Sequence, residues 1–110
     1  MKSEFDVIIS GAGPAGCTAA LALGSSGLKV ALMEKESFPR EKVCGDAIPA
    51  YAHKVLATID DSYAAALENL EGKNPVSLCR YTAPDRTVFD INFRENGLVC
   101  RRTVFDSFLL

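Results

Sequence analysis

The sequence comprises 110 residues, of which 48% are hydrophobic and 24% are charged, with a formal net charge of −2. This length and composition predict at most one small ordered domain and exclude a chain that is disordered throughout. The slightly acidic balance and scattered basic residues argue against a surface for nucleic acid, and no apolar run approaches the roughly 20 residues that span a bilayer.

The first 34 residues predict a βαβ unit. Residues 5–10 are apolar and partly β-branched, which is typical of a short buried strand, and residues 17–23 have the Ala/Leu-rich composition of a helix. Gly27 is suitably placed to end this helix as its C′ residue. Residues 29–33 predict a second buried strand with Glu34 at its carboxyl end. Strand, glycine-rich turn, helix and strand within about 30 residues match the size of one βαβ unit.

Further helices are expected downstream of a polar loop over residues 35–46. The helical segments are predicted at 47–59, 62–70 and 103–110. Pro49 suits the first turn of the first of these helices, and Asp46 suits its N-cap, although an acid catalyst is the alternative for this residue. Ser62 is the expected N-cap of the second helix, and Gly72 is its expected stop.

Three strands are expected in the second half of the chain, over residues 76–82, 87–93 and 98–101. The turn residues at 83–86 join the first two as a hairpin, and Asn96-Gly97 indicates a second turn. The fold class is therefore α/β: a Rossmann-like βαβ unit followed by antiparallel strands.

The glycine-rich turn Gly11-Ala12-Gly13-Pro14-Ala15-Gly16 predicts a dinucleotide site. Gly11 permits the sharp turn out of the strand, Gly13 lets a pyrophosphate approach the backbone, and Gly16 lets the helix lie close to the strand. The start of the helix then offers unpaired N–H groups and a positive dipole end to phosphates. Pro14 fits there because a first-turn N–H lacks an intrahelical partner.

Glu34 completes this pattern, since it lies close to the spacing at which a carboxylate binds a ribose hydroxyl. Its charge disfavours the 2′-phosphate of NADP, so the site is expected to take FAD or NAD. Spacing alone does not separate these two cofactors.

The four cysteines, Cys17, Cys44, Cys79 and Cys100, form no C-x-x-C pair, and His53 is the only histidine. We therefore predict no metal site and four separate, mostly buried thiols. Met1 is followed by a strand-like run rather than a basic region and a long apolar segment, so no signal peptide is expected. Free thiols without a signal predict a cytoplasmic protein.

Three segments resemble flavoproteins. DVIISGAGPAGCTAALALGSSGLKVALMEK is similar to the N-terminal fingerprint of the aromatic-hydroxylase and glutathione-reductase type. Residues 38–46 (FPREKVCGD) and 102–109 (RTVFDSFL) are similar to two motifs of the geranylgeranyl reductase family. The resemblance implies FAD as cofactor. It also implies an FAD-binding unit at residues 1–74, strands of a substrate-domain sheet at 75–101, and the start of a helix that returns to the FAD-binding unit at 102–110.

The resemblance also implies which residues contact FAD. Gly11, Gly13, Pro14, Ala15 and Gly16 would line the pyrophosphate, and Glu34 would bind the adenosine ribose. The loop residues Cys44, Gly45 and Ala47 would lie along the cofactor, and Arg102 would reach its phosphates. A reactive thiol is the alternative for Cys44, and solvated loop charges are the simpler interpretation of Arg40 and Lys42. No catalytic residue is identified.

The resemblance implies an FAD-dependent oxidoreductase that reduces isoprenoid double bonds, with NAD(P)H or a ferredoxin-like protein as electron donor. An aromatic monooxygenase or halogenase and a non-catalytic nucleotide-binding fragment are the alternatives. The two parallel strands and the uncapped apolar end predict that the chain is the N-terminal part of a larger protein, inactive alone. Self-association through strand edges and a peripheral membrane location of the full-length protein are further expectations.

Overall fold

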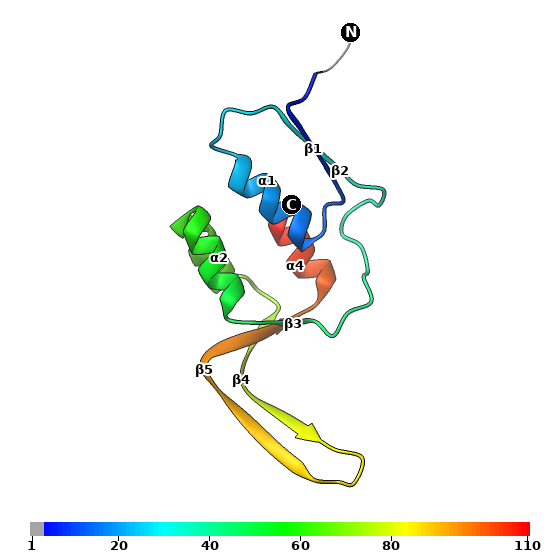
Figure 1. The fold of residues 1–110 in the computed structure, drawn as a ribbon, viewed down its shortest axis with the longest axis vertical. Helices are drawn as coiled ribbons and strands as arrows, with labels where there is room; N and C mark the ends of the chain where they lie inside the picture. The colour runs from blue at the N-terminus through cyan, green and yellow to red at the C-terminus, as the bar shows by residue number, and fades with distance from the viewer. Residues whose placement is uncertain (1–3) are drawn as a thin grey trace.

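The computed structural model describes residues 4–110 and contains two small sheets and four helices within those residues. In chain order the elements are β1 (Val7–Ser10), α1 (Pro14–Leu23), β2 (Val30–Met33), β3 (Ala47–Ile48), α2 (Tyr51–Ile59), α3 (Asp61–Glu68), β4 (Lys73–Thr82), β5 (Val88–Cys100) and α4 (Arg102–Leu109). The molecule is elongated, 63 × 28 × 23 Å, because the β4–β5 hairpin projects away from the helices (Figure 1).

The βαβ unit is confirmed. β1 and β2 pair in parallel, with Val7 opposite Val30 and Ser10 opposite Met33, and α1 contacts both strands. α1 ends at Leu23, the last residue of the predicted helix, and Gly24 is its C-cap, in helical conformation. Gly27, at φ +78°, lies in the turn that leads to β2, so the prediction that it is the C′ residue was wrong.

The predicted helix over 47–59 begins only at Tyr51, because Ala47 and Ile48 form β3 instead. β3 pairs antiparallel with β5 at Leu98 and Val99, and the N–H of Cys100 donates to the carbonyl of Asp46. Asp46 adopts φ +58° outside any helix, so the prediction of an N-cap was wrong; Ala50 occupies that position.

Two further boundaries differ from the prediction. The N-cap of α3 is Asp60, whose carboxylate accepts a hydrogen bond from the N–H of Ser62; Ser62 itself lies inside the helix. α3 ends at Glu68, and Gly72, at φ +83°, lies in the turn to β4 rather than at the helix end.

The hairpin is confirmed, but the predicted turn at Asn96-Gly97 was wrong. β5 is a single strand from Val88 to Cys100 that pairs with both β3 and β4, and its register with β4 shifts between the pairs Val76–Gly97 and Leu78–Asn92. A Cβ atom on Gly97 would lie 2.9 Å from the carbonyl oxygen of Ile48. Glycine is therefore needed for close approach of β3 rather than for a turn.

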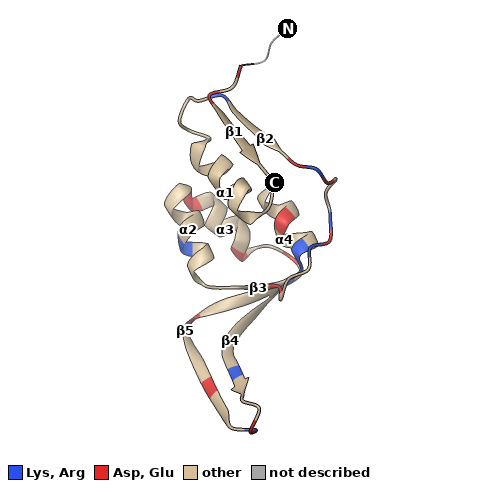
Figure 2. Cartoon of the chain, turned by 45° about the vertical axis from the view of Figure 1, so that its right-hand side comes forward, with Lys and Arg blue, Asp and Glu red and all other residues tan. Residues whose placement is uncertain are grey.

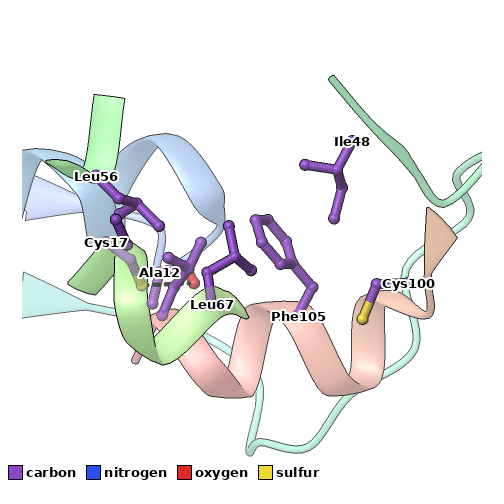
Figure 3. Close-up of a cluster of buried hydrophobic side chains, with 9 residues drawn as sticks. Ala12, Cys17, Ile48, Leu56, Leu67, Cys100 and Phe105 are labelled. Atoms are coloured by element: carbon purple, nitrogen blue, oxygen red, sulfur yellow. Dashed lines mark hydrogen bonds between the residues drawn. The ribbon is translucent and has the colours of Figure 1, made fainter. Parts of the chain in front are cut away.

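The core lies between the helices, where Leu56 from α2, Leu67 from α3 and Phe105 from α4 are buried together with Cys17 from α1 (Figure 3). Cys17 and Cys100 are buried, but Cys79 is only partly buried and Cys44 is exposed, so the prediction of mostly buried thiols holds for half of them. Within residues 4–110, no helix combines the length and the apolar character needed to cross a bilayer.

Candidate functional site

The glycine turn joins the carboxyl end of β1 to the first residue of α1. Gly11 has φ +99°, a conformation that L side chains rarely adopt, and its N–H donates to the carbonyl of Met33 on the neighbouring strand. Gly13 is the N-cap of α1, Pro14 follows it, and no side chain caps the helix. The amides of the first turn therefore keep their capacity to bind an anion.

The absence of a Cβ atom has different consequences at Gly13 and at Gly16. A Cβ on Gly16 would lie 1.8 Å from the carbonyl oxygen of Gly11 and 3.3 Å from Cγ2 of Ile9, so Gly16 lets α1 lie against the strand. A Cβ on Gly13 would meet only Nη2 of Arg40, at 3.8 Å. The space beside Gly13 is therefore open, as a diphosphate that approaches the backbone requires.

Glu34 connects the end of β2 to the glycine turn. Its carboxylate accepts hydrogen bonds from the N–H groups of Ala12 at 2.8 Å, Lys35 at 2.9 Å and Glu36 at 3.0 Å. These backbone donors, that of Ala12 foremost, lower the pKa of Glu34 below its usual value. The carboxylate is thus ionised at neutral pH and held in position, with lone pairs left for the hydroxyl groups of a ribose.

A groove of about 920 Å³ runs along these residues and the loop that follows β2. Its charged lining is mixed, and charged positions of both signs lie along the loop between β2 and β3 (Figure 2). The lining residues are Ser10, Gly11, Gly13, Met33, Glu34, Lys35, Glu36, Arg40, Glu41, Lys42 and Arg102. The groove therefore joins an acid that suits a ribose, open backbone that suits a diphosphate, and guanidinium groups.

Two of these cations share one buried carboxylate. Asp106 of α4 is 1% exposed and accepts hydrogen bonds from Nε and Nη2 of Arg102 at 2.6 and 2.9 Å. Nη1 of Arg40 lies 2.6 Å from Oδ2 of Asp106 as an ion pair, but its N–H groups have no well-aligned acceptor. Burial alone would raise the pKa of Asp106, but the hydrogen bonds from Arg102 and the positive charges of Arg102 and Arg40 together lower it.

Sequence reasoning missed Asp106 and treated Arg40 as a solvated charge. The guanidinium of Arg40 instead stacks on the ring of Phe38, 4.7 Å from its centroid, and its side chain is only 13% exposed. The i,i+4 spacing of Arg102 and Asp106 is a signal that could have identified their pairing. No comparable local signal links Arg40 to this cluster.

A second, mainly apolar cavity of about 300 Å³ shares Arg102 with the groove. Pro14, Cys44, Ala47 and Arg102 are among its lining residues. The pKa of the exposed Cys44 thiol is lowered, first by the N–H of Asp46 and then by the side chain of Arg102. A lowered pKa increases the thiolate fraction, so both interpretations of Cys44 remain consistent with its surroundings.

The structure thus places Gly11, Gly13, Glu34 and Arg102 around one groove, and Pro14, Cys44 and Ala47 beside the adjoining cavity. The remaining three predicted contacts, Ala15, Gly16 and Gly45, are not part of either lining. Contact of all ten residues with a cofactor stays a prediction. The observations that favour a bound dinucleotide are the uncapped start of α1, the open space at Gly13 and the fixed carboxylate at the end of β2.

Comparison with known proteins identifies related sequences and folds. The profile of the family described as FAD binding domain matches residues 6–71. A digeranylgeranylglycerophospholipid reductase of Methanocella arvoryzae is 31% identical over 96% of this chain and 26% of its own length. This chain therefore spans about a quarter of that relative.

Solved structures of flavoproteins share the fold. A geranylgeranyl bacteriochlorophyll reductase-like protein of Thermoplasma acidophilum superimposes with a TM-score of 0.72 at 25% identity, over 96% of this chain and 26% of that one. A flavin-dependent brominase superimposes with a TM-score of 0.75 at 25% identity, over 97% of this chain and 26% of that one. The α/β architecture, including the hairpin and α4, is thus that of FAD-binding flavoproteins.

Proposed function

Because this chain belongs to the FAD-binding domain family, we propose that it forms the FAD-binding portion of a flavin-dependent oxidoreductase that reduces isoprenoid double bonds. The observation that carries the proposal is the match to a digeranylgeranylglycerophospholipid reductase over 96% of the chain. That match continues past residue 71, where the match to the FAD-binding profile ends, into the hairpin and α4.

In this proposal the residues of the groove and those at 44–47 divide the binding of FAD among them. The amides at Gly13 and the first turn of α1 bind the diphosphate, and Glu34 accepts hydrogen bonds from the adenosine ribose. Cys44, Gly45 and Ala47 line the path toward the flavin end. FAD, when bound, supplies two-electron transfer through its isoalloxazine ring. The chain itself binds and orients the cofactor, and Glu34 disfavours a nucleotide with a 2′-phosphate.

The domain boundaries belong to the same proposal. Residues 1–74 and 102–110 form the FAD-binding unit, and residues 75–101 belong to the sheet of a substrate domain. One face of the hairpin supports this division, because Tyr81 stacks on Phe89 at 5.1 Å and both rings are at least half exposed. An exposed apolar strand face of this kind favours contact with further protein or with an apolar substrate.

The proposal is tested by a turnover assay on the purified protein, which is expressed with any sequence that continues it in its gene. Flavin absorbance and an FAD titration test binding. Chemically reduced protein is then mixed, without oxygen, with a geranylgeranylated glycerophospholipid. We expect the lipid to gain two hydrogen atoms per reduced bond and the flavin to be reoxidised. A flavin that stays reduced beside an unchanged lipid would overturn the proposed substrate, and absence of FAD binding would overturn the site.

A halogenase or monooxygenase is the second candidate, favoured by the superposition on the brominase. The same reduced protein distinguishes it, since such enzymes need oxygen. Oxygen-dependent bromination or hydroxylation of an aromatic substrate, with no reduction of the lipid, would establish this alternative. NADH, NADPH and a reduced ferredoxin, supplied in turn, would identify the electron donor.

Two physical expectations accompany the proposal. A lipid substrate implies that the enzyme works at a membrane surface, which flotation with lipid vesicles would test. The exposed apolar residues of the hairpin favour self-association, and a monomeric elution volume in size-exclusion chromatography would refute it.

A further inference from the structure

The ion cluster of Arg40, Asp106 and Arg102 joins two segments that lie far apart in the sequence. Among residues 4–110, Asp106 is the one charged residue that is fully buried, and both arginines line the groove beside Gly13. Burial of a carboxylate costs free energy unless the carboxylate is paired and hydrogen-bonded, so the two arginines are needed to keep Asp106 ionised in this position.

The cluster uses only part of its hydrogen-bonding capacity. Arg102 donates to Asp106 through Nε and Nη2, and Arg40 approaches it through Nη1. Nη1 of Arg102 and Nη2 of Arg40 are not used on the carboxylate. Nη2 of Arg40 lies next to the open space at Gly13, 3.8 Å from where a Cβ would stand.

The charges of the cluster do not cancel. Two guanidinium groups face one carboxylate, which leaves one net positive charge at the wall of the groove. Guanidinium groups bind phosphate oxygens with paired, charge-assisted hydrogen bonds. The arginines are also held before any ligand arrives, Arg40 by Phe38 and both by Asp106. Ligand binding then requires little further loss of side-chain freedom.

We infer that Asp106 is a positioning residue, a shared counter-ion that holds Arg40 and Arg102 against the diphosphate of the bound dinucleotide. Arg40 is thereby a diphosphate ligand alongside Arg102. This inference rests on the FAD site proposed above and adds to it a residue, Arg40, that comes from the loop after β2.

Calorimetric titration with ADP, adenosine and FAD tests the inference, since ADP carries the diphosphate and adenosine lacks it. Arg40→Gln should weaken ADP and FAD binding about tenfold, the loss of one charge-assisted hydrogen bond, and should change adenosine binding less than about twofold. Asp106→Asn should also weaken the binding of ADP more than that of adenosine, although it makes the net charge of the protein one unit more positive. A simple charge effect would strengthen ADP binding instead, and a purely structural role would weaken both ligands alike.

Asp90→Asn is the matched control. Asp90 accepts a two-point hydrogen bond from Arg80, at 2.8 Å for both contacts, on the distant hairpin. The charge change is the same, but the ratio of ADP to adenosine affinity should stay at the wild-type value.

The outcomes separate this inference from the proposed function. If circular dichroism shows that Asp106→Asn does not fold, Arg40→Gln decides alone. Wild-type protein that binds FAD while Arg40→Gln binds ADP normally would overturn the inference only. Wild-type protein that binds neither FAD nor ADP would overturn the proposed site and the inference with it.

Discussion

Replacement of Gly16 by alanine should destabilise the fold, whereas replacement of Gly13 by alanine should weaken FAD binding, although the two glycines lie in one turn. A Cβ at Gly16 would be 1.8 Å from the carbonyl oxygen of Gly11, and an ordinary contact needs more than 3 Å. α1 would have to move away from β1 by roughly 1.5 Å. Because backbone atoms oppose this Cβ, we expect a cost at or above the upper end of overpacking, about 3 kcal/mol. That is a large part of the roughly 5–15 kcal/mol that stabilises a typical domain.

Gly13→Ala is expected to leave the fold intact. The backbone of Gly13, at φ −74° and ψ −176°, is accessible to alanine, and its Cβ would meet only Arg40. We expect a change in stability of about 1 kcal/mol or less, since alanine is a poorer N-cap but restricts the unfolded chain. The methyl group would occupy the space that a diphosphate needs, so FAD affinity should fall at least about tenfold.

The assay combines urea unfolding followed by circular dichroism with FAD fluorescence titration on the same samples. Gly16→Ala should lower the urea midpoint strongly, and Gly13→Ala should lower FAD affinity with a nearly unchanged midpoint. A stable Gly16→Ala protein would show that α1 and the turn separate at little cost. Normal FAD binding by Gly13→Ala would show that the diphosphate does not approach this backbone, and would refute the site.

Three other outcomes follow from the structure. Glu34→Gln should weaken FAD binding roughly tenfold in the same titration, because the ribose loses a charged acceptor; unchanged affinity would contradict that role. Phe105→Ala should lower the free energy of unfolding by about 3–5 kcal/mol, since the ring is 6% exposed in the core, and a urea midpoint close to wild type would argue against this packing. The pKa of Asp106 is lowered by folding, so the unfolded chain takes up the proton first. Its contribution to stability is full above about pH 4 and is lost as the pH falls through the folded pKa. Urea midpoints between pH 2.5 and 7 should therefore show an acid limb that is weaker in Asp106→Asn; equal limbs would refute the argument.

The βαβ unit could be predicted because its causes are local. The apolar runs of β1 and β2, the glycine turn and the acid at the strand end act through residues close in sequence. The errors lie where a distant strand decides. Ala47 and Ile48 have a helical context, but the free edge of β5 pairs with them, and α2 begins only after Pro49. Gly97 has turn chemistry with Asn96, yet it lies within a continuous strand because β3 approaches there.

The amino-acid sequence by itself determined where the backbone stays open at the start of α1, because the effects of the glycines and of an acid at fixed spacing are local. Only the tertiary structure decided which charged side chains lie beside that open backbone. Arg40 and Asp106 are brought together by the return of α4 to the loop after β2, and nothing in either segment alone encodes the other as its partner. Ion pairs between distant segments depend on the path of the whole chain, whereas the turn depends on six consecutive residues.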